Sequence, residues 1–121
     1  MEKFEELVKQ AVASLPQAFK EKLENVDIVI EDLPGPGELA SLGIDQPLSL
    51  FGLYQGIPQT QRGNNYMFVA PDKITIYKLP IVLTYQTPEA IKRKVRAVVL
   101  HEIGHHFGLS ESDMTNKSTV Q

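Results

Sequence analysis

The sequence predicts a single α+β domain, in which a small mixed sheet of about four strands packs against an N-terminal helix and a C-terminal active-site helix. Three observations predict this class. Apolar residues recur at helical spacing near both ends of the chain, and short β-branched runs lie between them. His101, Glu102 and His105 form a His-Glu-x-x-His motif near the C-terminus. A length of 121 residues supports one core, so residues 1–121 are expected to form one domain.

Composition and charge narrow the class of protein further. Hydrophobic residues make up 42% and charged residues 22% of the chain, which excludes a largely disordered protein. The net charge of −3 argues against a dedicated nucleic-acid binder. Without cysteine, any metal must be held by histidine and carboxylate groups. No stretch approaches the roughly 18 continuous apolar residues of a membrane span. We therefore expect a cytoplasmic protein, monomeric by default, with no nucleic-acid or membrane partner.

Two amphipathic helices are predicted at the N-terminal end. Pro16 separates them, because its ring removes a backbone donor and pushes the preceding residue out of helical geometry. The second helix covers residues 17–24, with Phe19 and Leu23 on its apolar side. The apolar side of the first helix is formed by Phe4, Leu7, Val8, Ala11 and Leu15. Both helices are expected to pack against the core.

The first strand and a long loop follow. Residues 26–30 are rich in β-branched side chains and place Val26, Ile28 and Ile30 on one face of a strand. Residues 32–47 begin with two Pro-Gly pairs, which predict an exposed loop.

Three further strands are predicted in the middle of the chain. Gly52 is a candidate bulge in the first of them. The Pro-Asp-Lys turn at residues 71–73 joins the other two into a hairpin. Residues 79–86 are a linker with some extended character, because Pro80 argues against a central strand. The predicted strands comprise residues 48–54, 66–70 and 74–78.

The last predicted helix, residues 88–107, carries the metal-binding motif. Thr87 is a suitable N-cap, and Pro88 suits the first helical position. Helical spacing sets His101, Glu102 and His105 within an arc of about 100° that overlaps the apolar side of the helix. Two neutral imidazoles can hold Zn²⁺, and the glutamate between them can accept a proton from a water molecule bound to the metal.

A zinc site needs a third protein ligand, and the chain just after this helix offers two. Gly108 is placed to reverse the chain at the end of the helix. Glu111 and Asp113 are the candidates that this reversal can bring to the metal, with Glu111 favoured and Asp113 as the alternative. His106 points about 100° away from His105 and is expected to pack beside the site rather than bind the metal.

Residues 101–111 and several upstream segments resemble the minimal zincin-like metallopeptidases, a family of small bacterial proteins. The resemblance implies a zincin-like fold, histidine ligands at His101 and His105, Glu102 as general base, and an acidic third ligand at position 111. This chain has glutamate at position 111, where relatives typically have aspartate. The upstream matches are Leu15-Pro16, Asn25-Val26, Glu31-Asp32-Leu33-Pro34, the stretch 52–58 (Gly-Leu-Tyr-Gln-Gly-Ile-Pro) and Pro71-Asp72-Lys73-Ile74.

These observations predict a zinc-dependent metallopeptidase with one Zn²⁺ ion on His101, His105 and Glu111, and Glu102 as the catalytic base. The resemblance also implies that a strand of the hairpin at residues 66–78 pairs with an extended peptide substrate.

Two other functions compete with this prediction. A metal-binding module that recognises a peptide or protein partner without catalysis would need the same ligands. The basic cluster at residues 92–96 would suit nucleic acid, but in an acidic chain it is expected to be a solvated helix flank.

Overall fold

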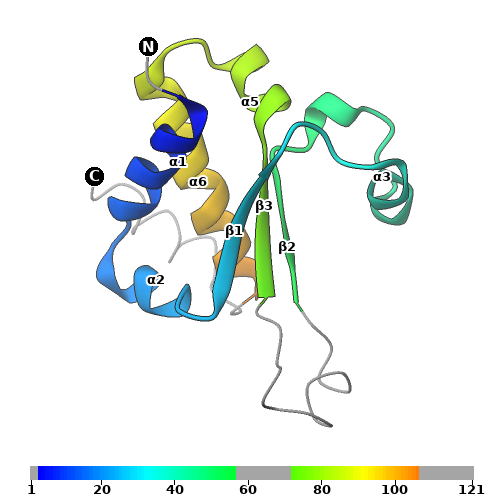
Figure 1. Cartoon of the computed structure of the whole chain (residues 1–121). Helices are drawn as coiled ribbons and strands as arrows, with labels where there is room; N and C mark the ends of the chain where they lie inside the picture. Colours follow the sequence, from blue (N-terminus) through cyan, green and yellow to red (C-terminus); the bar gives the residue numbers. More distant parts are fainter. Residues whose placement is uncertain (1–2, 57–71, 107–121) are drawn as a thin grey trace, which may run out of the picture.

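A mixed three-stranded sheet organises the structure, a computed structural model that describes residues 3–56 and 72–106. Strand β3 (Asp72–Tyr77) lies in the centre and pairs in parallel with β1 (Val26–Glu31). On its other side it pairs antiparallel with β2 (Gly52–Gln55). Figure 1 shows α1 (Phe4–Ala13), α2 (Gln17–Lys22) and α6 (Pro88–His106) on one side of this sheet, and α3 (Pro36–Leu42) on the other. The predicted α+β class is therefore confirmed.

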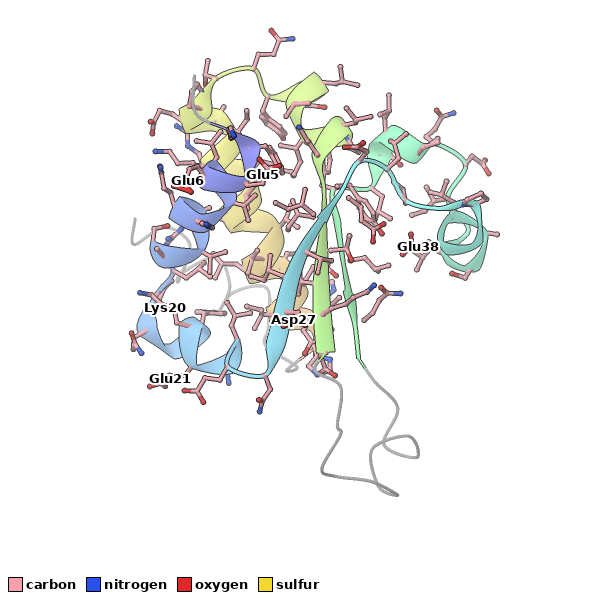
Figure 2. All side chains as sticks on the ribbon, in the orientation of Figure 1. Glu5, Glu6, Lys20, Glu21, Asp27 and Glu38 are labelled. Carbon is pink, nitrogen blue, oxygen red and sulfur yellow. The ribbon has the colours of Figure 1, made fainter. Side chains whose placement is uncertain are left out.

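The core lies between the sheet and the three helices on its first side. Ile74 and Ile76 of β3 are fully buried there, and alternate residues of β1 pack against the same core. The α6 residues that join them are Val95, Val98, Val99, Leu100 and Ile103. The predicted apolar sides of the two N-terminal helices are confirmed, because Phe4, Leu7, Val8, Ala11, Leu15 and Phe19 are all buried in it. Charged residues such as Lys20 and Glu21 project outward from α2 (Figure 2).

The predicted loop at residues 32–47 contains a helix, so that prediction was wrong. Pro36 begins α3 at a position where the missing N–H would have no helical partner, and the Glu38 carboxylate accepts a hydrogen bond from Gly35 N at 2.9 Å. Gly43 ends the helix with a positive φ of 68°. The Pro-Gly pairs thus mark a helix start rather than an irregular segment.

Helix α3 is linked to the central strand through one buried side chain. The Tyr77 hydroxyl donates to Glu38 Oε2 at 3.1 Å, and Glu38 lies on the side of α3 that faces the sheet (Figure 2). Burial, together with this carboxylate, raises the pKa of Tyr77 above its usual range.

The linker predicted at residues 79–86 is also partly helical, in α5 (Lys78–Thr84). Pro80 is compatible with this helix because it lies in the first turn, where its missing donor leaves no bond unmade. Burial of Pro80 and Ile81 holds the helix against the core. Pro80 correctly indicated that this segment is not a central strand, but proline is also compatible with the first turn of a helix.

The predicted strand at residues 48–54 is shifted and shortened. A 3-10 turn, η1 (Pro47–Ser49), occupies its start, and β2 covers only Gly52–Gln55. Gly52 pairs with Ile76 in continuous register, so it is not a bulge. Instead it allows a close approach: a Cβ built on Gly52 would overlap Val98 Cγ1 of α6 and lie 3.1 Å from the Thr75 carbonyl oxygen.

The predicted hairpin of residues 66–70 and 74–78 was wrong in its pairing. β3 is central, and β1 and β2 occupy its two edges, so the antiparallel partner of β3 is β2. Residues 66–70, the fourth predicted strand, lie outside the described residues. The sheet edge next to α6 is therefore that of β2.

The N-cap predicted for the last helix is confirmed. Ala90 N donates to Thr87 Oγ1 at 3.1 Å, and Ile91 N donates to the Thr87 carbonyl at 2.9 Å. Near the middle of α6, Arg96 is only 7% exposed and donates to Ser14 Oγ at 2.8 Å and to the Ser14 carbonyl oxygen, which ties the helix to the end of α1. Within the described ranges, no helix has the length and apolar character needed to cross a membrane.

Replacing Gly52 with alanine is expected to destabilise the protein by about 1–3 kcal/mol, because the new methyl group overlaps Val98 on α6. Urea denaturation of the purified variant measures this change. Gly37→Ala is the matched control, since a Cβ there meets nothing within 4 Å and alanine favours the helix. Equal unfolding midpoints for wild type and Gly52→Ala would contradict the packing argument.

Candidate metal centre

The two motif histidines lie side by side at the C-terminal end of α6. The ring centres of His101 and His105 are 4.1 Å apart, with an angle of 52° between the ring planes. Both side chains are exposed, whereas Glu102 is partly buried and Ile103 is fully buried. The helix thus carries the two candidate metal ligands at the rim of the core, where they are accessible from outside.

Glu102 is held by the main chain of the edge strand. Its Oε1 accepts a hydrogen bond from Tyr54 N at 2.8 Å, across 48 residues of sequence. Tyr77 N donates to the Phe51 carbonyl at 3.0 Å, so these two residues form a hydrogen-bonded pair between β3 and the start of β2. Such pairs alternate along antiparallel strands, so the N–H and C=O groups of Gly52 and Tyr54 face away from β3. Tyr54 N can therefore donate to Glu102. The carboxylate is therefore held at the edge of β2, and its residue lies in the same part of α6 as His101 and His105.

Tyr54 is in turn anchored by two side chains. Its hydroxyl donates to Asp72 Oδ2 at 2.7 Å, and its ring stacks on His106 with centres 4.0 Å apart and planes 16° from parallel. His106 Nε2 lies 3.7 Å from the same Asp72 oxygen. As expected, His106 packs beside the motif. Tyr54, Asp72 and His106 form a cluster that connects β2, β3 and the end of α6.

A groove leads away from the histidines between β2 and α6. Its volume is about 360 Å³, and His101 and Glu102 line it at one end while Lys94 lines it at the other. Its walls come from residues 49–52 and from Ala97 and Val98. An extended chain segment could therefore lie along the β2 edge and reach the histidines.

The two predicted candidates for the third metal ligand come after the end of α6 in the sequence. Glu111 and Asp113, together with Gly108, lie outside the described residues. Across residues 3–56 and 72–106, no three or more histidine, aspartate or glutamate side chains gather as a metal site would require. The two exposed imidazoles suit zinc in donor type and spacing, so the described part of the chain offers two ligands of a set that needs at least one more.

Sequence reasoning missed two residues of this site. No local pattern assigns a role to Tyr54, and Asp72 is predicted only as part of the turn at residues 71–73. Strand alternation and the resemblance at residues 52–58 pointed to this segment, but contacts over 48 and 18 residues cannot be read from local patterns.

The basic cluster at residues 92–96 also differs from the expected solvated flank. Arg96 is buried on Ser14, and the Lys94 amine lies 4.3 Å from the centre of the Phe51 ring. The Lys92 amine meets Gln10 Oε1 and Glu89 Oε1, each at 3.2 Å. Lys92 and Arg96 line one pocket together with Arg93 and Glu89, whereas Lys94 lies in the groove beside β2, so the cluster is divided between two sides of α6.

A helix that ends in two adjacent histidines, with a glutamate held toward a sheet edge, is the arrangement expected of a metal-dependent hydrolase. The comparison with known families agrees. The family model for zincin-like metallopeptidases matches residues 23–119, so the chain belongs to this family, and membership indicates a peptidase-type hydrolase. A search of curated proteins finds no match.

Replacing Tyr54 with phenylalanine is expected to lower the free energy of unfolding by about 1 kcal/mol, because it removes the bond to Asp72 and keeps the ring and the main-chain donor. Urea denaturation measures the change. Tyr85→Phe is the control, since the Tyr85 hydroxyl has no hydrogen bond among the described residues and only its ring packs, against Phe51. Similar losses in both variants would show that the Asp72 contact contributes nothing specific.

Proposed function

We propose that this protein is a zinc-dependent peptidase in which Glu102 acts as the general base. One observation carries the proposal: the Glu102 carboxylate is fixed by Tyr54 N beside two adjacent, exposed histidines. Membership of the zincin-like metallopeptidase family supports it independently.

His101 and His105 would hold the metal, with Glu111, or Asp113 as the alternative, completing the set. Their imidazole and carboxylate groups suit one Zn²⁺ ion. When bound, zinc supplies Lewis acidity, which polarises the scissile carbonyl and lowers the pKa of an attacking water molecule.

Glu102 has a geometry that suits a base better than a ligand. Its Oε1 is engaged by Tyr54 N, and its Oε2 has no hydrogen-bond partner among the described residues. The first bond holds the carboxylate in place, so the second oxygen is left to accept the proton of the attacking water and deliver it to the leaving amine. Because the donor is a backbone amide, its position depends on strand β2 and not on a mobile side chain.

The edge of β2 is where an extended peptide would bind. Gly52 presents its N–H and C=O groups away from β3, because it belongs to a non-hydrogen-bonded pair with Ile76. A peptide that pairs with these groups lies in the groove that leads to His101. This assignment replaces the hairpin edge that the sequence predicted, because β3 is the central strand.

Glu102→Gln is expected to keep zinc and to lower peptide hydrolysis by about 10²–10⁴-fold, because the amide can accept the Tyr54 hydrogen bond but cannot act as a base. Mass spectrometry of a peptide library incubated with each zinc-loaded protein measures hydrolysis, and elemental analysis measures zinc. If zinc-loaded wild type cleaves no peptide under varied conditions, a metal-binding module that recognises a peptide or protein partner becomes the better description.

The third ligand can be assigned from metal content. Glu111→Ala is expected to lower the zinc bound after dialysis from about one ion per chain to a small fraction, because two histidines alone bind zinc weakly. Asp113→Ala should retain nearly full occupancy. The opposite ranking would assign the role to Asp113, and unchanged zinc in both variants would reject both carboxylates as ligands.

A further inference from the structure

The groove beside the candidate metal centre carries a positive charge at its far end. Lys94 lines that end, and its amine lies 4.3 Å from the centre of the Phe51 ring and 5.7 Å from that of Tyr85. Among residues 3–56 and 72–106, no carboxylate lies within ion-pair distance of this amine. The adjacent cation on the other flank of the helix differs, because the Lys92 amine is 3.2 Å from a Glu89 oxygen. Lys94 is thus a partly buried cation resting on aromatic rings and facing a groove.

The wall between Lys94 and the histidines is apolar. Ala97 and Val98 line the groove between Lys94 and His101, and Leu50 and Phe51 add apolar surface at the Lys94 end, where the Lys94 amine lies over the Phe51 ring. Leu50 and Phe51 remain partly exposed. A ligand that fills this groove therefore needs apolar groups along its length and a negative charge at the Lys94 end.

The distance along α6 from Lys94 to the histidines indicates how many peptide residues would separate the negative charge from the cleaved bond. Lys94 precedes His101 by seven residues and His105 by eleven, so it lies about 14 Å along the helix axis from the midpoint of the two histidines. An extended peptide advances about 3.3 Å per residue, so this distance corresponds to about four residues. The outward-facing groups of Gly52 lie within this interval and offer main-chain pairing.

We propose that Lys94 is a specificity-determining residue, which selects peptides carrying aspartate or glutamate about four residues from the cleaved bond, with apolar side chains between. This inference rests on the proposed peptidase function. The anionic group is a side-chain carboxylate, because an apolar wall and a strand edge suit a peptide, whereas a nucleic-acid backbone would require several adjacent cations.

The first test reads substrate preference directly. A peptide library is digested with zinc-loaded wild type, Lys94→Gln and Lys92→Gln, and the cleaved sequences are aligned on the cut bond. The two variants lose the same charge from the same helix, but only Lys94 lines the groove. Wild type and Lys92→Gln are expected to enrich Asp and Glu about fivefold at positions three to five residues to one side of the cut, and Lys94→Gln should lose this enrichment. Cleavage without acidic enrichment, or enrichment that survives Lys94→Gln, overturns the proposal.

A binding measurement keeps the proposal separate from the question of catalysis. Two fluorescent pools of extended, apolar-rich peptides, identical except that one has glutamate where the other has glutamine, are titrated by anisotropy against the same three zinc-loaded proteins. The glutamate pool should bind about fivefold tighter to wild type and Lys92→Gln, and equally with the glutamine pool to Lys94→Gln. If wild type cleaves nothing but keeps this difference, only the peptidase function fails. Equal binding of both pools to wild type, or tighter binding of a single-stranded oligonucleotide that depends on Lys94, overturns the proposal.

Discussion

The close contact between β2 and the second half of α6 is the constraint on which the candidate site depends. Gly52 leaves room for Val98 where a methyl group would not fit, and this brings the edge strand near enough for Tyr54 N to reach Glu102 at 2.8 Å. The same approach closes one side of the groove that contains Lys94. This close contact therefore limits where the carboxylate can lie, because two closely packed elements cannot shift independently of each other.

The residues that pack α6 against the core and the two motif histidines lie on different sides of the helix. Val95, Val99 and Ile103 are fully buried and hold the helix on the sheet. His101 and His105 lie on the exposed flank of the same turns, and Glu102 lies between the two environments. Burial anchors the helix, so the exposed imidazoles can be oriented without being desolvated themselves, which keeps their nitrogens accessible to a metal.

The sequence predicted best what depends on local periodicity and capping. Val26–Glu31, the helix that starts after Thr87, and the apolar side of α1 were all recovered, because period and cap chemistry determine them directly. The Gly and Pro residues between positions 34 and 43 were wrongly predicted to form an irregular loop. Pro36 instead begins α3 and Gly43 ends it, because these residue types favour helix ends as well as loops.

Strand pairing was beyond the reach of local patterns for a different reason. Two strands adjacent in sequence were expected to pair, but β1 and β2 lie on either side of β3. This order depends on long-range contacts that no window of the sequence contains. The His-Glu-x-x-His residues fell together as predicted, because one helix carries them, whereas the Tyr54 and Asp72 partners come from separate strands.

The hydrogen bond that holds the Glu102 carboxylate comes from the main-chain N–H of Tyr54 and not from a side chain. Any residue at position 54 other than proline would supply the same N–H, so the position of the Glu102 carboxylate is set by where the strand lies and not by the identity of a side chain. The groups of Gly52 that face the groove belong to the same strand, two residues earlier. A peptide aligned on Gly52 would therefore be positioned relative to Glu102 by one short segment of backbone. Proton transfer requires the carboxylate and the substrate to lie within hydrogen-bond distance of a shared water molecule, and this common reference segment favours that arrangement.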